Sequence, residues 1–154
     1  MNVSEFEREV RFGLENLTRV RSNVLHILSQ NVDSVVRLSA LTYECLGYYN
    51  ALEHLFLRFI KFIGRKQPSG AFSHRDTLRT LEVIAGEYEV DLDPHTLQIC
   101  LELMAFRHVA TKIYGFLIDE AKLIVIVSRV EDSHEQIIEL VEDLLHAVQQ
   151  RNDR

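Results

Sequence analysis

The sequence predicts an all-α protein, an antiparallel helical bundle of about five helices that forms one domain over residues 1–154. Apolar residues recur at intervals of three and four along most of the chain, which is the spacing of one helix face. Only two prolines and six glycines interrupt these runs. A hydrophobic content of 47% in 154 residues also suffices for one substantial core without disulfides.

Two long helices are expected in the first part of the chain. The first begins at Ser4, which can act as N-cap together with the glutamate three residues later, and ends near Asn31. The second begins at Asp33 or Ser34, both suitable caps, and carries periodic apolar residues up to Gly64. Gly64 suits a helix C-terminus because glycine adopts the left-handed conformation without strain.

Proline and glycine mark the turn before a shorter third helix. The turn is predicted at residues 68–70, where Pro-Ser-Gly stand in succession. Ser73 or His74 then begins a helix that carries apolar residues towards Gly86. Brief connections of this kind are typical of antiparallel helical bundles.

The fourth and fifth helices have clear start signals. The Asp93–Pro94 pair offers a cap followed by the residue best suited to the first helical position, and this helix runs towards a stop at Gly115. Asp119 begins the last helix, with an interruption near residues 132–133 as one option. The β-branched run at residues 124–127 leaves a buried strand open as an alternative, although no partner strand is evident.

The charge distribution limits how the protein can contact nucleic acid. A net charge of −6 argues against indiscriminate binding, which draws on a broad basic field, so any RNA contact is expected to be local. Acidic residues gather in the last helix, where a solvated face is the commoner explanation and a surface for a basic partner is the alternative. Basic residues gather in two places: Arg58, Lys61, Arg65, Lys66, Arg75 and Arg79, and then Arg107 with Lys112.

Cysteine and histidine placement argues against disulfides and metals. Cys45 and Cys100 lie within apolar helical patterns, so we interpret them as reduced core thiols of a cytosolic protein. Histidines have no partners at ligand spacing, and we expect neither a metal nor a cofactor. The chain shows no signal-peptide pattern and no apolar run long enough to span a bilayer, so we expect a cytoplasmic protein without membrane contact.

The end of the fourth predicted helix carries the side chains that are the strongest candidates for a functional site. Helical spacing puts Arg107, Thr111 and Tyr114 on one stripe, with His108 and Lys112 on a second stripe beside it. A guanidinium close to an imidazole, an ammonium and a phenol suits a phosphodiester, because arginine grips phosphate oxygens bidentately and keeps its charge. The alternative is an exposed basic face, since the helix dipole favours cations late in a helix.

Three segments follow one another in a distinctive order: residues 48–56, residues 68–70 with His74 and Arg75, and residues 106–115 with Asp119. Together they resemble the HepT-like branch of the HEPN superfamily over about residues 40–123. The resemblance implies a small bacterial protein with a helical-bundle fold that forms a homodimer, in which two motifs line a shared cleft. It also implies a metal-independent endoribonuclease toxin of a type VII toxin–antitoxin system. The implied partner is a minimal nucleotidyltransferase antitoxin that adenylylates (AMPylates) a tyrosine of the toxin.

Carried over by position, Arg107 is the motif arginine and Tyr114 the modifiable tyrosine. The family has a histidine in the slot where this chain has Lys112, five residues after Arg107. Histidine, with a pKa of about 6.5, can accept the proton of a ribose 2′-hydroxyl, whereas lysine, with a pKa of about 10.4, stays protonated at neutral pH. Lys112 can still bind phosphate, and His108 is another candidate for the base.

Two further residues are candidates for the cleft. Glu53 matches a polar position that points to the cleft in related bundles, with a structural hydrogen bond as the alternative. His74 either faces the cleft or caps the third helix. Three functions stay open: a ribonuclease toxin, a catalytically degenerate relative that binds or regulates a nucleotidyltransferase, and a helical interaction protein with only architectural resemblance.

Overall fold

The computed structural model describes residues 1–70, 73–112 and 119–154, and within these ranges the side chains of residues 107–112 are not described. All regular structure in these ranges is helical, which confirms the predicted all-α bundle. The five helices of the described residues are α1 (Val3–Ser29), α2 (Ser34–Phe62), α3 (Ser73–Glu87), α4 (Pro94–Lys112) and α5 (Glu120–Asn152).

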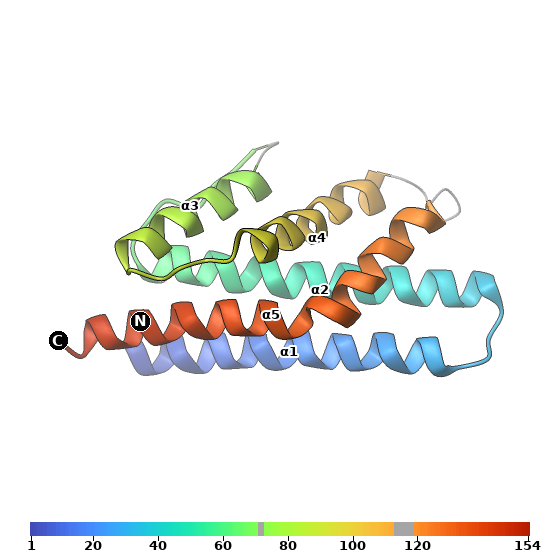
Figure 1. The fold of residues 1–154 in the computed structure, drawn as a ribbon, viewed down its shortest axis with the longest axis horizontal. Helices are drawn as coiled ribbons and strands as arrows, with labels where there is room; N and C mark the ends of the chain where they lie inside the picture. Colours follow the sequence, from blue (N-terminus) through green and yellow to red (C-terminus); the bar gives the residue numbers. More distant parts are fainter. Residues whose placement is uncertain (71–72, 113–118) are drawn as a thin grey trace.

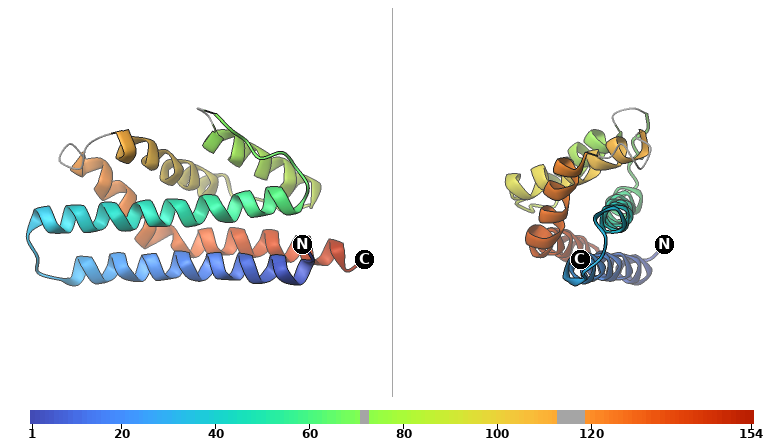
Figure 2. Two further views of the ribbon diagram at one scale, coloured as in Figure 1. Left: turned by 180° about the vertical axis from the view of Figure 1, so that it is seen from behind. Right: turned by 90° about the vertical axis from the view of Figure 1, so that its right-hand side faces the viewer.

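The helix α2 is the centre of the bundle and contacts each of the other helices. Figure 1 shows α1 and α2 as a long antiparallel pair, with the C-terminal half of α5 beside α1. The helices α3 and α4 lie over the side of α2 that faces away from α1, as both views in Figure 2 show. Tyr48, Leu52, Phe56 and Phe59 of α2 are fully buried, so this helix supplies much of the core that the other four helices share.

The N-cap of the first helix lies two residues before the predicted one. Asn2, and not Ser4, is the N-cap: its side chain accepts a hydrogen bond from the amide of Glu5 at 2.9 Å. The carboxylate of Glu5 accepts one from the Asn2 amide at 3.3 Å, which completes a capping box. Asn2 and Ser4 both have a glutamate three residues later, so sequence spacing alone does not separate them.

The ends of α1 and α2 agree closely with the sequence. Gln30 is the C-cap of α1, one residue before the predicted stop at Asn31. Asp33 caps α2 as predicted and accepts a hydrogen bond from the amide of Val35 at 2.9 Å. Gly64 follows α2 with a φ of +82°, a left-handed conformation that favours glycine.

The third helix starts at Ser73, as predicted, but passes through Gly86 and ends at Glu87. The left-handed residue that closes it is Glu89, with a φ of 58°. The amides of Glu89 and Val90 bond back to carbonyls in the last turns of α3, at 3.3 and 2.8 Å. These bonds form a Schellman-type end in which a non-glycine residue takes the left-handed position.

Both predicted caps of the last two helices are confirmed. Asp93 precedes α4, and its carboxylate accepts a hydrogen bond from the hydroxyl of Thr96 at 2.9 Å, which lowers the pKa of Asp93. Asp119 caps α5 and accepts from the amide of Ala121 at 3.0 Å. The predicted stop of the fourth helix, Gly115, lies outside the described residues.

The last helix is continuous, so an interruption near residues 132–133 and a strand at residues 124–127 are both wrong. Figure 1 shows instead that α5 bends near its middle: its first part inclines towards α4, and its second part runs along α1. The side chain of Arg21 donates from Nε and Nη2 to the carbonyl oxygen of Glu131, at 3.3 and 3.1 Å. A side chain that bonds to the helix backbone is a recognised cause of such a bend.

A histidine of α5 lies inside the core. His134 is 3% exposed, and its two ring nitrogens lie 2.9 Å from the Tyr48 hydroxyl and 3.2 Å from the Thr18 hydroxyl. Because the Thr18 hydroxyl already donates to the carbonyl of Leu14, it accepts a hydrogen bond from Nε2–H of His134. Nδ1 is then the acceptor for the Tyr48 hydroxyl, so one neutral imidazole joins α1, α2 and α5.

The two cysteines are buried and unpaired, as the sequence predicted. Burial raises the pKa of the Cys45 thiol and of the Cys100 thiol to about 12. Both are therefore neutral at physiological pH and serve as small apolar residues of the core.

Candidate functional site

The motif residues lie on the C-terminal half of α4, as the sequence predicted. Arg107, His108 and Lys112 all belong to this helix, so their helical spacing is confirmed, although their side chains lie outside the described part. Tyr114 lies outside the described residues altogether. The roles of these four residues therefore stay predictions.

The turns that precede Arg107 are held firmly on the core. Leu103, Met104 and Phe106 are each 4% exposed or less, so three buried apolar side chains directly precede Arg107. Arg129 of α5 forms an ion pair with Glu102 of α4, with an N···O distance of 2.9 Å. Packing and a cross-helix ion pair thus fix the direction in which α4 enters the motif.

The two other predicted cleft residues stand on neighbouring helices. Glu53 is a half-buried residue of α2, and His74 is a half-buried residue in the first turn of α3. Because α2 contacts both α3 and α4, the three helices that carry the candidate residues pack against one another. This arrangement is compatible with a shared cleft, and the participation of Glu53 and His74 in it stays a prediction.

A basic groove of about 400 Å³ runs between α3 and α4. Sequence reasoning included its two arginines in a basic cluster but did not pair them with α4. Two short helices that follow each other in a bundle are expected to pack as antiparallel neighbours, and this expectation could have placed the two arginines beside α4. The groove is lined by Arg75, Leu78, Arg79 and Glu82 of α3 and by Pro94, Leu97, Gln98 and Leu101 of α4.

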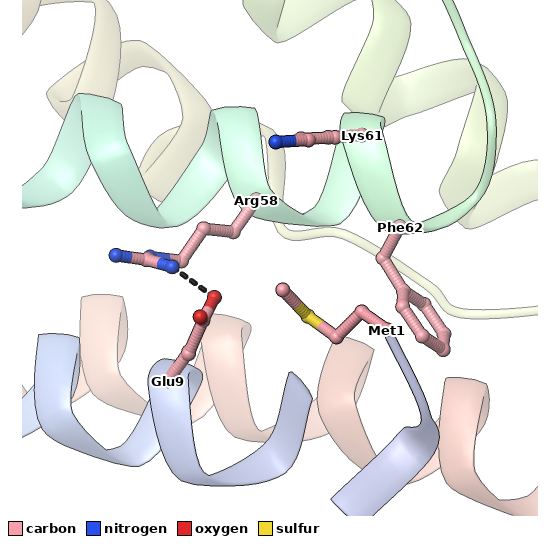
Figure 3. Close-up of a pocket in the computed structure, with 5 residues that line it drawn as sticks. All are labelled: Met1, Glu9, Arg58, Lys61 and Phe62. Carbon is pink, nitrogen blue, oxygen red and sulfur yellow. Dashed lines mark hydrogen bonds and ion pairs between the residues drawn. The ribbon is translucent and has the colours of Figure 1, made fainter. Parts of the chain in front are cut away.

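A second hollow, of about 260 Å³, lies between the start of α1 and the end of α2. Figure 3 shows Lys61 extending over it, while the Arg58 guanidinium turns towards Glu9 and forms an ion pair with its carboxylate. Phe62 and Met1 form its apolar wall. The pairing with Glu9 leaves Lys61 as the cation of this hollow that extends over it.

The described parts of the chain contain neither clustered metal ligands nor a helix that could span a membrane. No group of three or more histidine, cysteine, aspartate or glutamate side chains there could hold a metal ion. Over the same residues, no helix combines the length and the apolar character that crossing a bilayer requires.

The sequence profile of the family described as HepT-like protein matches residues 40–149, which is well over half of the chain. The chain therefore belongs to the HepT-like family of the HEPN superfamily, which confirms the resemblance found in the sequence. No curated protein and no solved structure gives a significant match to this chain.

Proposed function

We propose that this chain is a toxin-type HepT-like protein that cleaves RNA without a metal, slowly, because Lys112 stands where the family has a histidine. The observation that supports this most is the family match over residues 40–149, together with an arginine at the motif position of a well-anchored α4. The substrate is then a single-stranded segment of RNA, contacted locally by a chain whose net charge is −6.

The proposed reaction uses the RNA's own 2′-hydroxyl as nucleophile. A general base removes the 2′-hydroxyl proton, and the oxygen attacks the adjacent phosphorus. The bond from phosphorus to the 5′-oxygen breaks and this oxygen takes a proton from water, which leaves a 2′,3′-cyclic phosphate on one product and a 5′-hydroxyl on the other. In this proposal the Arg107 guanidinium holds the non-bridging phosphate oxygens and stabilises the charge that develops on them.

The identity of the base decides how fast this chain works. A lysine with an ordinary pKa of about 10.4 is protonated at neutral pH, so Lys112 binds phosphate and does not accept the 2′-hydroxyl proton. We assign the base to His108, which follows Arg107 directly and lies about 100° around the helix from it. This displaced position is the reason that we expect weak activity.

Family membership also suggests partners. We propose that two copies of the chain pair so that their α4 motifs face one cleft, and that a minimal nucleotidyltransferase antitoxin attaches adenylate to Tyr114. Coexpression with such a nucleotidyltransferase should add mass in whole adenylate units, and Tyr114→Phe should abolish the increase. An unchanged mass in the wild-type protein would count against the modification.

The cleavage proposal is tested with the purified, partner-free protein, transfer RNA and messenger RNA in the presence of a chelator. We expect slow cleavage by the wild type, loss of cleavage in Arg107→Ala and faster cleavage in Lys112→His. Arg19→Ala, a change at an exposed arginine of α1, is the matched control and should cleave as the wild type does. Cleavage that persists in Arg107→Ala would refute the assigned role of that residue.

A second function is favoured by one observation, the lysine in the histidine slot. In that alternative the chain is a catalytically degenerate HEPN protein that binds or regulates a nucleotidyltransferase. No cleavage by the wild type, combined with cleavage by Lys112→His, would establish this alternative in place of the ribonuclease.

A further inference from the structure

We propose that the groove between α3 and α4 binds the single-stranded RNA segment next to the cleaved phosphate, with Arg75 and Arg79 contacting its phosphates. This inference rests on the proposed function, because it extends the RNA path from the motif of α4 along the surface of the bundle. It identifies groove contacts with the substrate that the motif itself does not supply.

The groove is chemically complementary to a nucleic-acid strand. Arg75 and Arg79 are one helical turn apart on α3, which separates them by about 6 Å along the axis, on the order of the spacing of successive phosphates in an extended strand. Leu78, Leu97 and Leu101 give the groove an apolar surface against which the faces of unstacked bases can pack. Phosphates and bases thus both find complementary surfaces within one groove.

The groove is also aligned with the candidate site. The helices α3 and α4 are antiparallel, so the Arg75 end of the groove is the end nearer to the C-terminal half of α4. Along α4, positions 108 and 112 follow Leu101 by seven and eleven residues, which returns them to the same helical stripe. Position 108 is about 10 Å further along the axis, so a strand lying in the groove leads directly into the motif.

The charges around the groove set where the RNA path ends. Arg79 is highly exposed, and its nearest carboxylate, that of Asp76, lies 4.0 Å away, an exposed pair that competes only weakly with a phosphate. Glu82, one turn beyond Arg79, lines the far part of the groove and repels phosphates. We therefore expect a short contact of a few nucleotides that ends between Arg79 and Glu82.

The test measures binding of a 2′-O-methyl RNA oligonucleotide, which lacks the nucleophilic hydroxyl and so reports binding without cleavage. The dissociation constant is measured from 0.05 to 0.5 M salt, because each phosphate contact to a single strand contributes about 0.7 to the slope of log affinity against log salt. We expect Arg79→Ala to lower this slope by about 0.7. If the variant and the wild type bind equally at 1 M salt, this change in slope weakens binding by the variant about fivefold at 0.1 M salt.

Glu82→Gln and Arg19→Ala are the matched variants. Glu82→Gln removes the repulsive charge and should tighten binding at low salt, whereas Arg19→Ala changes an exposed arginine of α1 and should leave the slope unchanged. Wild-type binding with the same slope in Arg79→Ala as in Arg19→Ala would overturn the groove while leaving the proposed function intact. Failure of the wild type to bind RNA at all would overturn both.

Discussion

Replacing Tyr48 by phenylalanine removes one hydroxyl from the centre of the core and leaves the shape of the side chain unchanged. Tyr48 is fully buried, and its hydroxyl donates to Nδ1 of His134 at 2.9 Å. The change leaves that nitrogen buried without a donor, which costs about 2 kcal/mol. For a chain of this size, about 2 kcal/mol corresponds to a fall of about 6 °C in the unfolding midpoint.

Thermal and urea unfolding followed by circular dichroism measure this loss. Tyr43→Phe is the control, because Tyr43 is 75% exposed on the same helix and its change should lie within about 0.5 kcal/mol of the wild type. Adding His134→Leu to Tyr48→Phe removes both partners and should recover part of the loss. Equal stability of Tyr48→Phe and Tyr43→Phe would refute the buried hydrogen-bonded network.

Three further predictions concern stability. Burial and the nearby Arg21 lower the pKa of His134, so near and below pH 6.5 the unfolded chain binds more protons than the folded one. The free energy of unfolding, measured in urea, should therefore be full above about pH 6.5 and fall as the pH drops below it. His134→Gln should show a less steep fall. Gly13→Ala should lower stability by about 1 kcal/mol in urea unfolding, because its Cβ would lie 2.5 Å from Leu55 Cδ2, and an unchanged midpoint would contradict this. Glu89→Gly should raise the free energy of unfolding by about 1 kcal/mol, because the φ of Glu89 is 58°; a lower free energy of unfolding would contradict the strain.

Helix starts were predictable where one residue alone could act as the cap. Asp93 and Asp119 each precede a long periodic segment, and both cap the helices that follow. The first cap was missed because Asn2 and Ser4 offer the same spacing to a glutamate, and the capping box forms at Asn2. The left-handed residue that follows α3 was not predictable, because Glu89 adopts a conformation that sequence statistics reserve for glycine.

Features that depend on local helical spacing could be predicted from the sequence, and features that depend on contacts between distant residues could not. The helical spacing of the motif on α4 is a local property, and the sequence predicted it correctly. The bend of α5 and the burial of His134 depend on Arg21, Tyr48 and Thr18, which lie between 86 and 116 residues away in the chain. Periodicity carries no information about such contacts, so the sequence reasoning discounted His134.

The most direct test of the central claim is the chemistry of the RNA ends after incubation with the purified protein in chelator. The proposed mechanism predicts products that carry a 2′,3′-cyclic phosphate and a 5′-hydroxyl, formed by the wild type and absent with Arg107→Ala. A substrate whose ribose at the cleaved position is 2′-O-methylated should resist cleavage. Products that carry a 5′-phosphate, or intact RNA with both the wild type and Lys112→His, would contradict the proposal.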